Sequence, residues 1–384
     1  MRPLRRIVFW LFVIAYVAAT PVAILYALGY IWKPGSDVGL VKTGLIALAS
    51  TPEDATIFLG GRRYTRPTPA TIRDLLPGAY EIRLSHPGYE DWGFRALVRP
   101  ERATVLDRIL LLPSRRALRA VADGPWDDLH AAAQGRDLLL RRGTAWFVLD
   151  ARDPSSPPRE ITNLLPGPPD EVALDRQNRL EFFVRIKERV FRIDLEENAI
   201  YPDVAPPARR IGTHRGRLVI ETPDGTRLRL NRRGEAIAEP PIPPNFFGRG
   251  HSPLAPDADE ARWLFADGRR LGIVERIEDA DEELPRWNER ILHQHSSPIQ
   301  RAGWAHDDSH VLFSSRGALW LLALDRGGAG PPRVVCEISR SGAFHFDEAS
   351  GRIFAIDPSG RLGELNLVPP RLLIPLPVRG EDIP

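Results

Sequence analysis

The stretch Ala302–Asp325 reads AGWAHDDSHVLFSSRGALWLLALD. A polar turn at Asp307-Asp308 leads into the apolar run Val311–Phe313. A glycine turn at Gly317 then leads into a second apolar run, which ends in Asp325. Short apolar runs bounded by Asp and Gly turns are typical of antiparallel hairpins. The stretch therefore predicts a small β-sheet.

The same order of strand, turn and strand recurs along the last two thirds of the chain. Five further segments show it: 137–150, 175–194, 217–230, 256–274 and 346–367. Hairpins that repeat every ~40–50 residues are the mark of a β-propeller with four-stranded blades. Residues 114–384 are therefore predicted to form a propeller of about six blades, with one or two β-sandwiches as the alternative. The units resemble the degenerate blades of surface and periplasmic proteins, although no Trp-Asp or Gly-His pair recurs.

A separate β module is predicted before the repeats, over residues 44–113. Its short strand-like runs are separated by turn dipeptides such as Pro77-Gly78 and Pro87-Gly88. Tyr80–Leu84 alternates cleanly between apolar and charged residues, as a half-buried strand does. About five strands are expected, and this number indicates a small β-sandwich; they are 45–49, 55–59, 80–84, 96–98 and 105–112.

This module resembles the PEGA domain family. The matching residues are Ser50–Ala55, Ile57-Phe58, Thr68-Pro69, Leu75–Tyr80 and His86–Tyr89. The module departs from the family pattern at Asp54, where the family has glycine, and at Gly60-Gly61-Arg62, where Asp-Gly is usual. Aspartate tolerates left-handed backbone, so the turn can survive. The resemblance implies a binding or spacer module of bacterial and archaeal surface proteins, often with a transmembrane anchor and without catalytic residues.

Aromatic residues of the module are the candidate ligand contacts. Tyr80 and Tyr89 are expected to cap the small core with their rings and to form hydrogen bonds at its edge. Alternatively, Tyr89, Trp92 and Phe94 form a platform on which a sugar stacks.

An uncharged run, Ile7–Trp32, precedes both modules. About 20 apolar residues cross a bilayer as a helix, and a kink at Pro21 is tolerated there. A secretory signal has a shorter apolar region that ends in small residues, whereas this run ends in Tyr30-Ile31-Trp32. A single membrane anchor over residues 7–32 is therefore predicted, followed by a linker over 33–43. The alternatives are a cleaved signal and a buried core helix.

Basic residues on the two sides of the run predict its orientation. Arg2, Arg5 and Arg6 precede it, whereas Lys33 and Lys42 follow it. Because basic residues are retained on the cytoplasmic side, residues 1–6 are expected in the cytoplasm and the rest of the chain in the periplasm or outside the cell. A protein that faces the cytoplasm as a sensor is the alternative.

Composition narrows the function. The chain has 384 residues, with 52 Lys and Arg against 50 Asp and Glu. It therefore lacks the basic excess of a nucleic-acid binder, and no nucleic-acid partner is expected. The one cysteine, Cys336, excludes a disulfide framework and is expected in a buried strand. No nucleophile elbow, phosphate loop, dinucleotide fingerprint or zinc helix occurs in the sequence, and no cofactor is predicted.

Histidines and one acidic run are the remaining candidates for chemistry. His293 and His295 share one side of an expected strand and could hold a metal ion. The other histidines considered are His251, His306, His310 and His345. The run Glu278–Glu283 is expected to be a solvated loop, with a weak cation site as the alternative.

The leading functional hypothesis is a non-enzymatic, membrane-anchored envelope protein. It would present a PEGA-like module and a propeller to a protein or glycan partner. The competing hypothesis is an anchored propeller enzyme, a hydrolase or lyase acting on an envelope polysaccharide. His293, His295 and two carboxylates gathered at the mouth of the propeller channel would favour the enzyme.

Overall fold

The computed structural model describes residues 2–27, 30–32, 40–131, 137–153, 156–174, 181–214, 217–231, 234–237, 243, 246–247, 255–256, 261–277, 286–325, 328–329 and 331–369. The chain divides into two compact units, Met1–Arg115 and Arg116–Pro384. Each unit is described by itself below.

The first unit begins with helix α1 (Arg2–Ala27). Its window Val8–Leu25 is long and apolar enough to cross a membrane, as a signal sequence would also be, and none of it is buried. Pro21 lies within the helix, and beside it the Thr20 hydroxyl donates to the Tyr16 carbonyl at 2.7 Å. The helix ends five residues before Trp32, so the prediction of one helix through Trp32 was wrong at that end.

A short hairpin follows the helix. Strand β1 (Tyr30–Trp32) pairs antiparallel with β2 (Leu40–Lys42), with Tyr30 opposite Lys42. Trp32 and its neighbours therefore extend as a strand, where the sequence suggested the last helical turn. Part of the expected linker over 33–43 is also strand, while its segment 33–39 lies outside the described residues.

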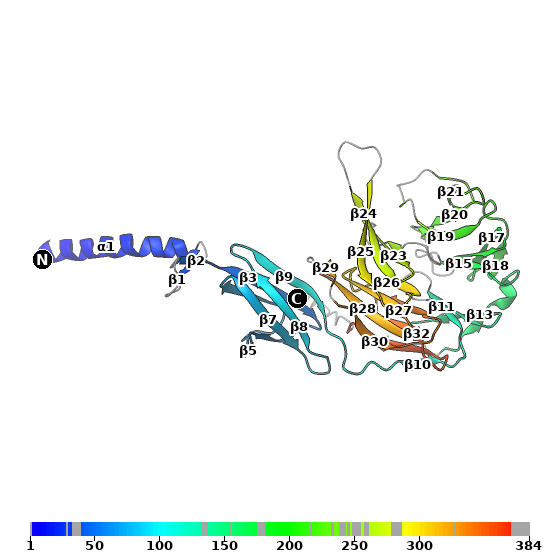
Figure 1. Ribbon diagram of the computed structural model, residues 1–384, viewed down its shortest axis with the longest axis horizontal. Coiled ribbons are helices and arrows are strands. Elements are labelled where there is room, and N and C mark those ends of the chain that lie inside the picture. Colours follow the sequence, from blue (N-terminus) through cyan, green and yellow to red (C-terminus); the bar gives the residue numbers. More distant parts are fainter. Residues whose placement is uncertain are drawn as a thin grey trace, which may run out of the picture. The chain divides into compact units, whose positions relative to one another are not determined.

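The rest of the first unit is a sandwich of two sheets (Figure 1). One sheet has the order β6-β3-β9, with β3 (Gly44–Thr51) and β9 (Ala103–Leu110) parallel and β6 (Ala70–Leu75) antiparallel to β3. The other has the order β5-β4-β7-β8. Its strands are β5 (Arg62–Arg63), β4 (Thr56–Leu59), β7 (Gly78–Ser85) and β8 (Trp92–Val98).

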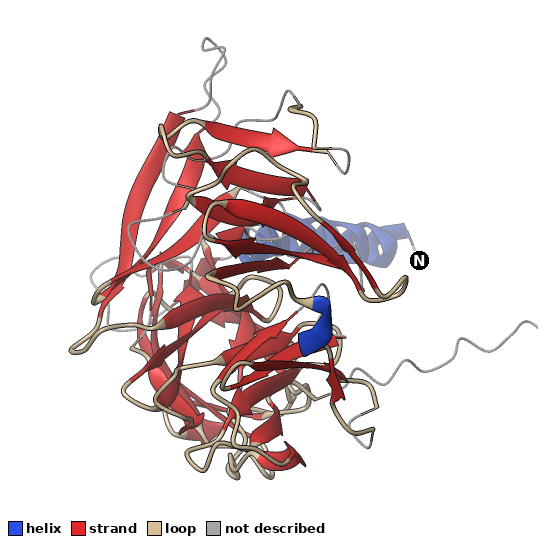
Figure 2. Cartoon of the chain, turned by 90° about the vertical axis from the view of Figure 1, so that its right-hand side faces the viewer, coloured by secondary structure: helices blue, strands red, loops and turns tan. Residues whose placement is uncertain are grey.

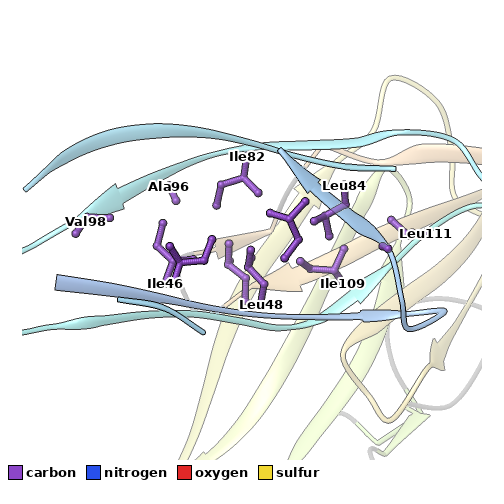
Figure 3. Packing of buried hydrophobic residues seen from close by; sticks show 12 residues of the cluster. Ile46, Leu48, Ile82, Leu84, Ala96, Val98, Ile109 and Leu111 are labelled. Atoms are coloured by element: carbon purple, nitrogen blue, oxygen red, sulfur yellow. The ribbon is translucent and has the colours of Figure 1, made fainter. Parts of the chain in front are cut away.

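The core of the sandwich lies between these sheets. Ile46 and Leu48 from β3 face Ile82 and Leu84 from β7, and all four side chains are almost fully buried (Figure 3). The alternation predicted for Tyr80–Leu84 is present, because Glu81 and Arg83 point outward. Strands β5 and β6 were not predicted: β5 is only two exposed arginines, and β6 has one buried side chain, Ile72.

The described part of the second unit holds six sheets, which confirms the predicted propeller of about six blades. In chain order they are β11 (Asp128–Ala131) to β14 (Arg159–Glu160), β15 (Glu171–Leu174) to β18 (Ala199–Tyr201), β19 (Arg210–His214) to β21 (Arg227–Leu230), β22 (Ala255–Pro256) to β25 (Arg286–Gln294), β26 (Arg301–Ala305) to β30 (Arg333–Glu337), and β31 (Phe344–Asp347) to β33 (Leu362–Asn366). We call them blades 1 to 6.

The ring of blades is closed by a strand from the other end of the unit. Strand β10 (Arg119–Ala122) precedes blade 1 but pairs with β33 of blade 6. Gly363 lies opposite Ala120, and a Cβ on Gly363 would be 2.7 Å from the Leu118 Cβ. Glycine is therefore required there for β10 to approach this closely.

Apolar side chains pack between successive blades. Leu138 and Phe147 of blade 1 share a cluster with Phe354 of blade 6, and Leu139 and Trp146 share another with blade 2. Further clusters join blades 2 and 3, 3 and 4, and 4 and 5. These clusters cover both faces of blades 1 to 4. Figure 2 shows the strands of the unit joined by loops, with a short helical turn, η2 (Thr162–Leu164).

Candidate binding sites

A buried hydrogen-bonded corner explains the first PEGA motif. Residues 52–55 carry the chain from β3 in one sheet to β4 in the other. Asp54 has φ of 64°, so the aspartate adopts the left-handed backbone expected at the family's glycine. The Thr68 hydroxyl accepts from the Ala55 backbone N–H at 3.0 Å and lies 2.7 Å from the Ser50 hydroxyl. Thr68 is 1% exposed, so these bonds hold the corner in a dry environment.

Tyr80 performs the role predicted for it. Its ring packs against the sandwich core, and its hydroxyl donates to the Leu76 carbonyl at 3.0 Å. The bond closes the loop Leu76-Pro77 between β6 and β7. This motif is therefore structural.

The three candidate sugar contacts lie near one another in sequence but divide into two groups. Trp92 and Phe94 stack with ring centroids 5.7 Å apart and 17° between their planes. Tyr89 instead contacts His86 edge-on, with centroids 5.1 Å apart, and it packs against the core. Burial raises the pKa of the Tyr89 hydroxyl above its usual value.

The Trp92–Phe94 pair is carried by β8, the last strand of its sheet. Trp92 packs on the core, whereas Phe94 is 38% exposed and Leu97, on the other face of β8, is 55% exposed. This edge therefore offers exposed apolar contact area.

A charged pair lies where two inner strands, β11 and β26, begin, and the inner strands of a propeller surround its central channel. Arg301, the first residue of β26 in blade 5, donates to the Leu129 carbonyl at 2.7 Å and pairs with Asp128 in blade 1. The His130 Nε2 is 3.2 Å from the other Asp128 oxygen, and the His130 ring stacks on Trp146.

These partners fix the ionisation of Asp128. Burial alone would raise its pKa, but the hydrogen bond from His130 and the charge of Arg301 outweigh burial, and the pKa lies far below the usual value. A carboxylate that stays ionised and paired is a poor general base near neutral pH. The group is suited to joining blades 1 and 5 across the first strand of blade 6.

A second group of charges joins blades 2 and 3. Glu171, the first residue of β15, accepts from Arg185 at 3.3 Å and from the Ile211 backbone N–H at 2.9 Å. It also lies 3.8 Å from Arg210, the first residue of β19. Neither group was predicted. In both groups the only signal in the sequence is a charged residue at the start of an inner strand. The role of that residue becomes evident only when the blades are placed side by side.

His293 and His295 lie away from the first strand of their blade. His293 is near the end of β25, the last strand of blade 4, and His295 follows directly after that strand. The His293 Nε2 and His295 Nδ1 are 3.3 Å apart, and the two rings pack against Phe313 and Trp320 of blade 5. Burial lowers the pKa of both histidines. The structure therefore does not place these two histidines with two carboxylates at the mouth of the channel, which is the arrangement that would favour an enzyme.

The remaining histidines are dispersed. His310 is buried beside His306. Burial, together with the charge of His306, lowers the pKa of His310 to about 3. The Ser309 hydroxyl lies 2.8 Å from the His310 Nδ1. His345 is on β31 of blade 6. No set of three His, Cys, Asp or Glu side chains within the described residues has metal-binding geometry. His251 and Glu278–Glu283 lie outside the described residues.

Cys336 lies in β30, as the sequence predicted for a core strand. Burial raises the pKa of its thiol to about 12. The thiolate is the reactive form, so this side chain is chemically inert at neutral pH.

Comparison with known proteins gives a family match and similar solved structures. Residues 43–110 match the model of the PEGA domain family, which confirms the resemblance drawn from the motifs. The chain is also similar to the β-propeller domain of Cps50 (Swd1) from Myceliophteria thermophila, with 13% identity, a TM-score of 0.39 and coverage of 74% of this chain and 93% of that one. No curated protein matches the sequence. The chain thus carries a segment that matches the PEGA domain, and the described part of its second unit forms six propeller-like sheets.

Proposed function

We propose that the protein is a single-pass membrane protein of a bacterial cell envelope that presents two binding modules. The helix α1 anchors it, the PEGA domain follows the helix, and the propeller presents its blades to a protein or a glycan. Residues 1–6 stay in the cytoplasm and both modules lie outside it. The role is non-enzymatic binding or scaffolding.

The exposure of the helix carries this proposal. Its apolar side chains are open over the whole window Val8–Leu25, with Phe12 71% and Tyr16 73% exposed. Leaving so much apolar surface in water is costly, at ~25 cal/mol per Å². A bilayer removes that cost. The proposed orientation agrees with the larger number of basic residues before the helix, Arg2, Arg5 and Arg6, than closely after it, Lys33 and Lys42.

Binding is favoured over catalysis by what the candidate sites contain. The charged groups at the starts of the inner strands are paired across blades. His293 lies on the outer strand of blade 4, and His295 directly follows that strand. The exposed apolar edge at Phe94 and Leu97 is available for contact.

Membrane extraction tests the anchoring part. Membranes from cells that make the full chain are washed with alkaline carbonate, which releases peripheral proteins, and the N-terminus of the retained chain is identified by mass spectrometry. We expect retention with residue 7 onward intact. Release of the chain, or an N-terminus after residue 27, would contradict the proposal because the helix would then be a cleaved signal.

Crosslinking in living cells tests the binding part. A photoreactive residue replaces Leu97 on the exposed edge, and a matched one replaces Thr71, which is exposed on the other sheet. We expect a distinct protein adduct, or retention on an envelope glycan column, for the Leu97 site. Identical behaviour of the two sites would argue against a specific surface there.

A further inference from the structure

The side chain of Lys42 contacts both the hairpin after α1 and the PEGA sandwich. The Lys42 ammonium lies 5.1 Å from the centre of the Tyr30 ring on the opposite strand. The same ammonium forms an ion pair with Glu101 in the turn between β8 and β9. Lys42 therefore joins the segment next to the helix to the body of the sandwich.

Backbone contacts fix the same turn more firmly. The Glu101 N–H donates to the Thr43 carbonyl at 3.0 Å, and the Leu45 N–H donates to the Arg102 carbonyl at 3.4 Å. A Cβ on Gly44 would come within 2.4 Å of the Arg99 carbonyl oxygen, so only glycine lets the turn approach this closely. Residues 99–102 are consequently held against the start of β3.

Lengths place this turn close to the bilayer surface. The apolar run Ile7–Ala27 spans about 31 Å at 1.5 Å per residue, which matches the ~30 Å hydrocarbon core of a bilayer. Residues 28 and 29 separate the helix from β1, so Tyr30 lies within about 11 Å of the helix end. Tyr30 is directly opposite Lys42, and Lys42 contacts the turn.

The turn carries charge that suits this location. Arg99 and Arg102 are both exposed, and they flank Glu101, whose carboxylate is engaged by Lys42. Guanidinium groups bind phosphate oxygens with two parallel hydrogen bonds. Basic residues close to a bilayer are also attracted to anionic lipid headgroups.

We propose that the β8–β9 turn is a second membrane contact, in which Arg99 and Arg102 bind the phosphates of lipid headgroups. The inference rests on the proposed membrane anchoring by α1. It differs from the expected linker, because the PEGA domain would rest on the bilayer with one end and would not stand off on a flexible spacer.

Fluorescence quenching in vesicles tests the contact. The full chain, with Cys336 changed to serine, receives one cysteine at Ala103 beside the turn or, in a second variant, at Glu53 in the corner at the far end of β3. Both positions are exposed. Each cysteine carries an environment-sensitive dye, and the vesicles contain phosphatidylcholine, phosphatidylglycerol and a lipid with a spin label on its headgroup. We expect strong quenching at Ala103 and weak quenching at Glu53.

A pair of matched variants assigns the contact to the arginines. Arg99→Gln with Arg102→Gln should remove most of the excess quenching at Ala103 and abolish its increase with phosphatidylglycerol. Arg66→Gln with Arg108→Gln, at exposed positions toward the corner, should leave both unchanged. Equal quenching at the two labels, or no effect of the first pair, would overturn the proposal.

Flotation of the chain with the vesicles distinguishes a failure of the membrane anchoring from a failure of the second contact. A chain that fails to float contradicts the anchoring itself. A chain that floats but shows equal quenching at Ala103 and Glu53 contradicts only the second contact.

Discussion

The Thr68 hydroxyl contacts both sides of the PEGA corner, the Ala55 N–H and the Ser50 hydroxyl. Changing Thr68→Val keeps the shape of the side chain but leaves the Ala55 N–H and the Ser50 hydroxyl without this partner. A buried group deprived of its hydrogen bond costs about 1–3 kcal/mol. We therefore expect faster hydrogen exchange in β3 and β4, measured by mass spectrometry. Thr71→Val, an exposed threonine in β6, is the control, and equal effects of the two changes would disprove the role of Thr68.

His310 makes the propeller sensitive to acid. Burial and His306 lower its folded pKa to about 3, from an ordinary value of 6.5. Between these values the unfolded chain binds a proton that the folded chain does not, so the free energy of unfolding decreases as pH falls from 6.5 toward 3. The slope from one such group is about 1.4 kcal/mol per pH unit.

Denaturant titrations at a series of pH values measure this slope. His310→Gln should make the pH dependence shallower in that window, whatever it does to stability at neutral pH. His86→Gln, in the PEGA domain, should leave the slope unchanged. A slope that is the same for His310→Gln and the unchanged protein would exclude this histidine as the cause.

At the scale of elements, the pair Arg301–Asp128 connects two blades that are not neighbours in the ring. Arg301→Gln removes the charge and the paired hydrogen bonds to blade 1. Hydrogen bonds of charged groups contribute about 1.5–3 kcal/mol, so we expect a loss of this order in the free energy of unfolding. Arg152→Gln affects the exposed pair with Asp150, for which a loss of about 0–1 kcal/mol is expected. Calorimetry distinguishes the two, and similar losses would refute the bridging role.

Closure of the ring depends on the approach of β10 to β33. Gly363→Ala would place a Cβ 2.7 Å from the Leu118 Cβ, and overpacking of this kind costs about 1–3 kcal/mol. Gly167→Ala is the control, because its nearest neighbours are atoms of Ile186 at 3.9 Å. We expect faster hydrogen exchange in β10 only for Gly363→Ala. Unchanged exchange in β10 would show that its pairing with β33 does not secure the ring.

Strands were easiest to predict where the same stretch of sequence contains both a turn signal and an apolar run. Hairpins such as β27 (His310–Ser315) and β28 (Ala318–Asp325) were evident, because Arg316-Gly317 supplies a left-handed turn between two apolar runs. Strand β5 was missed because two exposed arginines carry no periodic signal. The helix was drawn too long because Tyr30–Trp32 is apolar in either conformation, and its pairing with β2 is a contact that no local pattern encodes.

The candidate sites were harder to predict than the fold, because their residues also come together through contacts that no local pattern encodes. The motif residues Thr68 and Tyr80 could be anticipated, since they follow a family pattern. The channel pair could not be anticipated, because Asp128 and Arg301 are far apart in the chain and only the circular arrangement of blades brings them together. His293 and His295 were expected to share one side of a strand, but only His293 lies in a strand, because β25 ends at Gln294. The sequence also did not reveal that β25 is the outer strand of its blade.

As a whole, the molecule has one exposed apolar helix followed by two β modules. We have proposed that this helix holds both modules on the outer side of a membrane. Removing the helix should accordingly release the protein from membranes while the modules stay folded.

A reporter enzyme that is active only outside the cytoplasm, fused after Pro384, tests this claim most directly. We predict high activity in cells that carry the fusion. Moving Arg2, Arg5 and Arg6 to the other end of the helix should lower that activity, because the basic flank sets the orientation. An inactive reporter on an intact, membrane-bound fusion would contradict the account, since both modules would then face the cytoplasm.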